Sequence, residues 1–311
     1  MKRLLRVLMI IIFILFSFTY STAAETDLWS LYESVFKQCK YVDLTHAFNP
    51  TIAVWPGFGN AKFKPTVAGA DMPGYIGKGQ EFTYEKHGFI ATAYEIPTDQ
   101  YGTQLDPPAH WDEYGATISD LPATYAIRPL VVIDIHQKVA KDPGYHCSVD
   151  DIKAWEADHG TIPEGAVVMV RSDWHKRWAD VERYNKKPFP GVSLDALKFL
   201  HLERKILFHG HEPLDTDTTP NLEGEYWLMH NHFCQAEGVT NLDKVPEAGA
   251  LVSIGFAKPE GGSGGYARYI AICPSDWKYG KSVIETPGAP LPKQPYPLRR
   301  DQNGVLKPTK P

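Results

Sequence analysis

Short apolar runs separated by turn residues recur along this chain, which is the pattern of β-strands in a mixed fold. Helix-start signals stand between them at Ser148, with Asp151 three residues later, and at Ser193, before the apolar positions Leu194 and Leu197. Strands and helices mix without strict alternation and no repeat period occurs. The roughly 287 residues after the N-terminal segment suit a single α/β or all-β domain, and no linker divides them, so we predict one domain. The predicted strands span residues 41–45, 92–97, 130–135, 166–171, 205–208, 250–256 and 268–273.

Residues 1–24 have the composition of a secretory signal peptide. Lys2 and Arg3 open a basic start, an apolar run follows over 7–20, and small residues come next. Because a bilayer-spanning helix takes about 20 apolar residues, this run is short for a membrane span. We predict cleavage near Ala23 or Ala24, with an uncleaved anchor as the alternative. The mature chain, 25–311, is then periplasmic or secreted, with no membrane contact after cleavage.

Charge and cysteine content narrow the class of function. The net charge of −5 is mild and the basic residues are scattered, which argues against nucleic acid or anionic lipid and favours a small-molecule substrate. The sequence has no Cys-x-x-Cys spacing, which argues against a zinc ribbon. The four cysteines allow three full disulfide pairings, which the sequence does not rank. The Pro-rich tail, about 287–311, lacks apolar periodicity and is expected to run as extended chain over the surface or a partner subunit. The cysteines are Cys39, Cys147, Cys234 and Cys273.

The segment 99–111 carries the densest chemistry. Gln100, Gln104, Asp106 and His110 crowd one irregular turn directly after a predicted strand, and a glycine and a proline pair fix its backbone. We expect these four side chains to share one pocket. The alternative is a capped turn whose histidine is buried and satisfied by the backbone.

These residues resemble the hallmark of the cyclase family, the metal-dependent hydrolases that include kynurenine formamidase and isatin hydrolase. The hallmark reads His-x-Gly-Thr-His-x-Asp-x-Pro-x-His and is matched here at Gly102, Thr103, Asp106, Pro108 and His110. The resemblance implies a swivelling β/β/α fold in one domain, assembled as a homodimer or homotetramer. Further matching stretches, in the family's order, are 43–46, 55–57, 162–165, 189–191, 237–242 and 268–271.

The resemblance also implies a metal site, with one departure. Asp106 and a downstream acid, Glu237, become metal ligands, but Gln100 and Gln104 replace the two metal-binding histidines. A further family histidine falls by its spacing at Glu225, so His230 or His232 is the candidate in its place. Amide and carboxylate oxygens suit hard ions, so the expected cofactor is a divalent ion, Mn²⁺ in preference to Zn²⁺.

The expected chemistry is hydrolysis of a small amide, lactam or ester of the arylformamidase or isatin hydrolase type. A metal-bound water would attack the carbonyl with His110 as general base, and Trp111 and His211 would line the substrate pocket. One alternative is an exported binding protein in which the two glutamines have ended catalysis. A second, a serine hydrolase using Ser263 in a Gly-x-Ser-x-Gly pattern, conflicts with chain order, since the last histidine, His232, precedes that serine.

Overall fold

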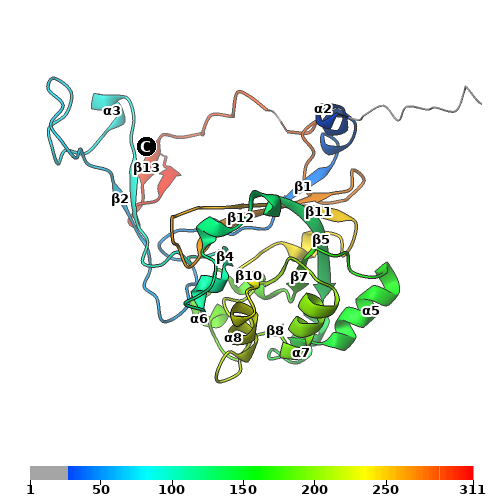
Figure 1. The fold of residues 1–311 in the computed structure, drawn as a ribbon. Helices are drawn as coiled ribbons and strands as arrows, with labels where there is room; N and C mark the ends of the chain where they lie inside the picture. Colours follow the sequence, from blue (N-terminus) through cyan, green and yellow to red (C-terminus); the bar gives the residue numbers. More distant parts are fainter. Residues whose placement is uncertain (1–26, 287, 311) are drawn as a thin grey trace, which may run out of the picture.

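A computed structural model describes residues 27–286 and 288–310. The predicted signal peptide lies outside the described residues. The centre of the fold is one mixed sheet in which β4 also pairs with β12, so that seven strands close into a barrel and β1 adds to its outside (Figure 1). The strands, in sheet order, are β1 (Lys40–Asp43), β12 (Gly265–Cys273), β11 (Ala250–Phe256), β5 (Ile127–Asp134), β7 (Val167–Arg171), β9 (Phe208–His211), β10 (Cys234–Glu237) and β4 (Gln104–Asp106).

Strands β5, β7, β9 and β10 run parallel, and their alternating side chains separate two apolar cores. Leu130 and Val132 of β5 face the barrel interior, whereas Val131 and Ile133 pack outward against helices. The outer layer includes α5 (Val149–His159), α7 (Leu194–Lys198) and η6 (Phe199–Glu203), which cover one side of the barrel (Figure 1). The capping box at Ser148 and the Ser193 cap are present as predicted.

The remaining helical segments are short and join the strands. On the barrel these are α4 (His136–Lys141), α6 (Val181–Tyr184), α8 (Glu223–His230), η2 (Pro108–His110), η3 (Ile118–Asp120), η4 (Ala123–Tyr125), η5 (Trp174–Arg177) and η7 (Leu242–Lys244), while α2 (Leu28–Leu31) and η1 (Tyr32–Phe36) precede β1. The short strands β6 (His146–Cys147) and β8 (Gly191–Val192) pair with each other in a separate parallel ladder. None of the described helices is long and apolar enough to cross a membrane.

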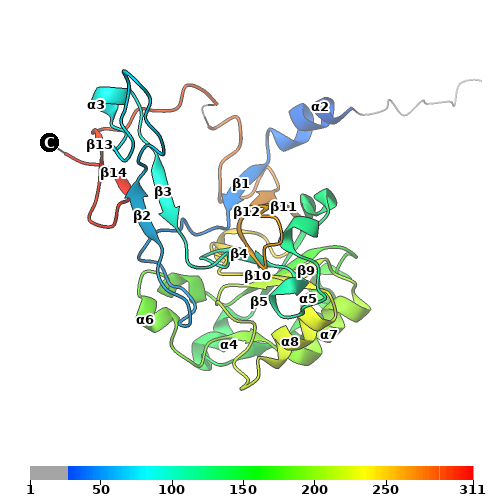
Figure 2. The ribbon, with the colours of Figure 1, turned by 60° about the vertical axis from the view of Figure 1, so that its left-hand side comes forward.

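An arm extends away from the barrel (Figures 1 and 2). It consists of β2 (Lys62–Pro65), β3 (Thr92–Glu95) and α3 (Tyr84–His87), together with a tail hairpin of β13 (Leu298–Arg300) and β14 (Leu306–Pro308). The Arg300 guanidinium donates to the Ala91 carbonyl at 2.8 Å and to the Thr92 hydroxyl at 3.1 Å, which fastens the tail to the arm. The tail therefore contains a hairpin that the expectation of purely extended chain did not include.

The predicted strands differ from the observed ones at several positions, for local reasons. Lys205 has a left-handed φ of 50°, so the strand predicted over 205–208 begins only at Phe208. Strands β4 and β10 were not predicted because each is short and carries polar side chains on one face. All four cysteines have free thiols, and three of them are buried.

Candidate active site

Two antiparallel strands bring the acidic hallmark residues together. In the ladder between β4 and β10, Glu237 stands opposite Gln104 and Gln235 opposite Asp106. Leu105 of β4 and Ala236 of β10 alternate with these residues and pack into the barrel core. The polar residues therefore form one stripe on the other face, as the hallmark spacing requires.

The Gln104 amide holds this stripe together. Its Nε2 donates to Glu237 Oε2 at 2.9 Å and to the two Asp106 oxygens at 3.2 and 3.3 Å. Gln235 Nε2 donates to the other Glu237 oxygen at 2.9 Å and to Glu225 at 3.2 Å. Oε1 of Gln104 is buried and has no hydrogen-bond partner among the described residues, although a buried amide oxygen normally accepts one.

Gln100 contacts the hallmark histidine. Its Nε2 lies 2.7 Å from His110 Nδ1 and donates to the Ser263 carbonyl at 3.2 Å. A carbonyl oxygen only accepts, so the amide nitrogen, and not its oxygen, faces both groups. Gly264 leaves the space for this side chain, since a Cβ there would approach Gln100 Cγ to 2.5 Å. Nδ1 of His110 is therefore an acceptor, and the neutral ring carries its proton on Nε2.

Helix α8 supplies an acid that the sequence prediction left out of the ligand set. Glu225 is buried, accepts from the Thr216 amide at 2.9 Å and faces a cavity of about 440 Å³. The cavity lies at the end of the polar stripe, and within the described chain no lysine or arginine lines it. Its lining consists of Val54, Trp55, Phe58, Gln100, Gly102, Gln104, His110, Trp111, Leu214, Asp215, Leu222, Glu225 and Glu237.

The carboxyl groups are crowded, and no lysine or arginine of the described lining separates them. Burial raises the pKa of Asp106 to about 7. Burial followed by repulsion from Glu225 raises the pKa of Asp215 to about 8, although Lys187 acts in the opposite direction. Burial and repulsion from Glu225 raise the pKa of Glu237 well above its usual range, while burial lowers the pKa of His110, which keeps its ring neutral near pH 7. The three raised carboxyl pKa values show that the surrounding protein disfavours the ionised forms.

The structure places the other sequence-predicted residues as follows. Trp111 lines the cavity, and its buried Nε1 has no partner among the described residues. His211 does not line it: the ring is buried at the end of β9, 2.9 Å from the Thr216 hydroxyl, and comes only within 3.8 Å of Glu237. His230 and His232 are exposed and stay outside the cavity, because α8 turns its buried face, with Glu225, toward the barrel.

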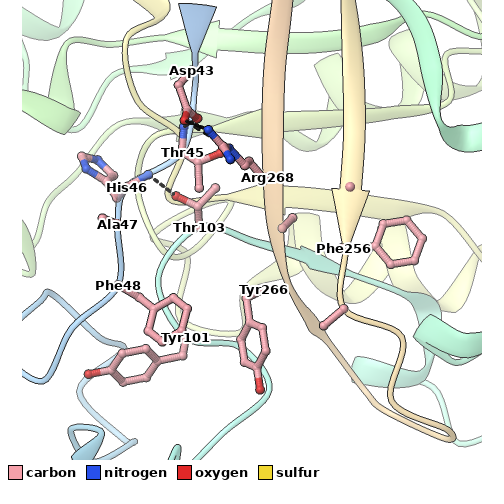
Figure 3. Close-up of a pocket in the computed structure, with 13 residues that line it drawn as sticks. Asp43, Thr45, His46, Ala47, Phe48, Tyr101, Thr103, Phe256, Tyr266 and Arg268 are labelled. Carbon is pink, nitrogen blue, oxygen red and sulfur yellow. Dashed lines mark hydrogen bonds and ion pairs between the residues drawn. The ribbon is translucent and has the colours of Figure 1, made fainter. Parts of the chain in front are cut away.

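Two other features contain polar groups but lack the arrangement of an active site. Ser263 has only Asp99 near its hydroxyl, at 3.4 Å, and no histidine contacts it in the described chain, which argues against the serine hydrolase. A second hollow of about 540 Å³ is lined by Phe48, Tyr101 and Tyr266, but its charged residues Asp43 and Arg268 pair with each other at 2.9 Å (Figure 3). His46 Nε2 is buried there without a partner among the described residues, but its ring is stacked on Trp178 at 3.9 Å, and the hollow has no group of unpaired carboxyls like that of the 440 Å³ cavity.

A third polar cluster has a composition that suits a metal ion. Asp173, His175 and Glu212 each offer one ligand atom, and these atoms lie within 4.8 Å of one another. The cluster follows the carboxyl ends of the neighbouring strands β7 and β9. No sequence motif marked it.

Comparison with known proteins gives concordant results. The family described as "Putative cyclase" matches residues 42–218. Isatin hydrolase of Roseibium aggregatum is 32% identical over 207 residues, which cover 61% of this chain and 78% of that protein. An isatin hydrolase bound to the product analogue thioisatinate superposes with a TM-score of 0.68 at 26% identity, over 82% of this chain and 100% of that one. Isatin hydrolase A from Labrenzia aggregata, bound to benzyl benzoate, gives 0.67 at 26% identity, over 79% and 98%.

Proposed function

This chain belongs to the cyclase family, and we propose that it is a metal-dependent hydrolase of a small amide, lactam or ester. The observation that carries the proposal is the set of buried carboxyl groups and one unpartnered amide oxygen beside His110, in a cavity of about 440 Å³. Similarity to isatin hydrolase over 78% of that protein favours a cyclic amide among these substrates.

The residues present fit a divalent cation. Gln104 turns its nitrogen to the carboxylates and leaves its oxygen without a protein partner among the described residues, as a metal ligand would require. Glu225 and Glu237 line the cavity, and Asp106 does not line it but accepts from the Gln104 amide beside it; no lysine or arginine of the described lining neutralises these carboxyl groups. All of these donors are oxygens, which favours Mn²⁺ or a similar hard ion over Zn²⁺. Such an ion, when bound, supplies a lowered pKa for water and polarisation of a carbonyl.

His110 then acts through Nε2. Since Nδ1 accepts from Gln100, the neutral ring presents an N–H at Nε2, which has no partner among the described residues. That N–H donates a hydrogen bond to the negative charge that develops when the carbonyl is attacked, as a neutral imidazole can do. This differs from the general-base role expected from the sequence. Glu225 or Glu237 takes the proton of the attacking water and returns it to the leaving nitrogen or oxygen.

Aromatic side chains favour a flat substrate. Trp55 and Phe58 have their ring centroids 5.3 Å apart on one wall, and Trp111 offers its unpartnered indole N–H. Asp215 lines the same cavity. These groups complement a planar ring that carries both a carbonyl and an N–H.

The experiment is a hydrolysis screen over aryl formamides, lactams such as isatin, and lactones, on protein first treated with a chelator and then given Mn²⁺, Mg²⁺ or Zn²⁺. We expect turnover of a planar cyclic amide that Mn²⁺ restores best. Tight ligand binding without turnover under any ion would instead support the exported binding protein as the function.

Location and assembly extend the proposal. The basic, apolar and small-residue pattern of residues 1–24 supports export to the periplasm or medium. The arm exposes Met72, Tyr75, Phe89 and Tyr94, between 43% and 56% of each side chain, which supports contact with a second copy in a homodimer or homotetramer.

A further inference from the structure

The cluster at the ends of β7 and β9 stands apart from the proposed active site. Asp173 and His175 come just after β7, Glu212 directly follows β9, and none of the three lines the 440 Å³ cavity. Glu212 is fully buried and His175 is 9% exposed. A fully buried carboxylate needs partners for all its lone pairs.

Only one of the two carboxylate oxygens of Glu212 has hydrogen-bond partners. Oε2 accepts from the Ser172 hydroxyl at 3.1 Å and from the His175 amide at 3.0 Å. Oε1 lies 3.2 Å from His175 Nδ1, yet neither atom makes a hydrogen bond within the part of the chain that the structure describes. A cation between these two atoms would give each of them a partner. A buried polar atom that is left without a partner destabilises the folded protein.

The separation matches two ligands of one ion. Zinc binds nitrogen and oxygen at about 2.0–2.2 Å, and a tetrahedral angle then puts such atoms about 3.3 Å apart. The other ring nitrogen, Nε2, lies 3.6 Å from Asp243 Oδ1, which is also buried without a partner among the described residues. A carboxylate behind a ligating imidazole is the usual outer partner of a metal-bound histidine.

Charge around the cluster is also incomplete. Arg171 Nε binds Asp173 at 2.9 Å and Lys176 Nζ binds it at 2.6 Å. These two cations face four carboxylates, which leaves an excess of two negative charges, the charge that a divalent ion neutralises. The carboxylates are Asp134, Asp173, Glu212 and Asp243.

We propose that Asp173, His175 and Glu212 bind a divalent transition-metal ion, zinc by their mixed nitrogen and oxygen donors, at a structural site distinct from the catalytic cavity. The site joins η5 to the segment after β9, whose residues Leu214 and Asp215 line that cavity. Bound zinc therefore fixes a wall of the cavity without touching the substrate.

The test is calorimetric titration of the purified, chelator-treated protein with Zn²⁺. Glu212→Gln keeps the shape of the side chain and an oxygen for Ser172, so it removes the ligand with little risk to folding. Loss of an outer-shell partner of a metal ligand usually weakens metal binding by about 10- to 100-fold, and we expect an effect of this size for Asp243→Asn. Because Glu212→Gln removes a ligand itself, it should weaken zinc binding by at least as much. His159→Ala is the matched control. His159 also lies close to a carboxylate, 3.4 Å from Glu247, but its side chain is 31% exposed and no third ligand is near it in the described chain, so its loss should leave zinc binding unchanged.

Asp106→Asn separates this site from the active site. Zinc binding that survives Asp106→Asn and is lost with Glu212→Gln supports the proposal, and a Co²⁺ absorption spectrum of tetrahedral type should follow the same pattern. Zinc binding that is lost with Asp106→Asn and kept with Glu212→Gln overturns it and assigns the ion to the cavity. A wild-type protein that binds no zinc also overturns it, leaving His175 and Glu212 as an ion pair, while the hydrolysis screen continues to test the proposed function independently.

Discussion

Removal of metal from the cavity should make the stability of the protein depend on pH in an unusual direction. An aspartate has a pKa of about 3.9 in an unfolded chain, and burial raises that of Asp106 to about 7. The folded state therefore binds the proton more tightly than the unfolded state. Without metal, the contribution of Asp106 to stability is fully present below about pH 4 and is lost as the pH rises through 7, the reverse of an ion-paired carboxylate.

The size of the effect follows from the shift. About three pKa units correspond to about 4 kcal/mol for the metal-free protein, at about 1.36 kcal/mol per unit, and about two of those units lie between pH 5 and pH 8. For a chain of this size about 2 °C of melting temperature corresponds to about 1 kcal/mol, so Asp106 alone should lower the melting temperature by about 5 °C between these two pH values. The raised pKa values of Asp215, Glu225 and Glu237 act in the same direction and add to this fall. A divalent ion favours the ionised carboxylates, so adding Mn²⁺ should raise the melting temperature at pH 8 far more than at pH 5.

The assay is thermal unfolding followed by circular dichroism, with chelator or Mn²⁺, at pH 5 and pH 8. Asp106→Asn is the control, because it keeps the shape of the side chain and removes one titrating group, so the fall in melting temperature should shrink by about the share worked for Asp106. A chelated wild-type protein with the same melting temperature at both pH values would refute the reasoning. An equal slope in Asp106→Asn would assign the effect to other carboxyl groups.

Four further results are expected. His110→Ala should lower turnover by about two to three orders of magnitude, the loss of one donor to the developing negative charge, with the metal content unchanged, measured by steady-state kinetics and elemental analysis. Gln100→Glu should place an acceptor at His110 Nδ1, which moves the ring proton to that nitrogen and raises the pKa of His110. NMR of ¹⁵N-labelled histidine would detect both changes, and an unchanged tautomer would contradict the orientation in which the amide nitrogen of Gln100 faces the ring. Gln100→His with Gln104→His should raise the zinc affinity of the cavity in calorimetric titration. Mass spectrometry of exported protein should find an N-terminus just after Ala23 or Ala24, and full-length chain in the medium would contradict cleavage.

The sequence predicted the fold class and the hallmark pocket because those depend on local pattern. Gln104, Asp106 and Glu237 meet as the motif implied, since a period of two places them on one face of paired strands. The prediction that His211 lines the substrate pocket was wrong. Which side chains of a buried strand reach a cavity depends on the neighbouring strands and helices, and the residues of the strand itself do not show it. The cluster of Asp173 and Glu212 depends on the parallel pairing of β7 and β9, a long-range contact that no local pattern ranks.

Glu225 helps to decide whether the cavity is a metal-dependent active site or a former one that has lost its metal. The family spacing places a histidine at this position, which made His230 and His232 the candidate replacements. The structure instead brings the carboxylate itself into the cavity, beside Gln104 and Glu237. Positions 104 and 225 thus carry side chains with oxygen donors where the family pattern has imidazoles, while Gln100 contacts His110 through its nitrogen. A site that had merely lost its metal would gain stability from apolar or smaller residues, because unpaired buried carboxyl groups are costly. The presence of Asp106 and Glu237 together with a third buried acid, Glu225, is explained if a divalent cation still occupies the cavity, which is the proposal that the metal titrations test.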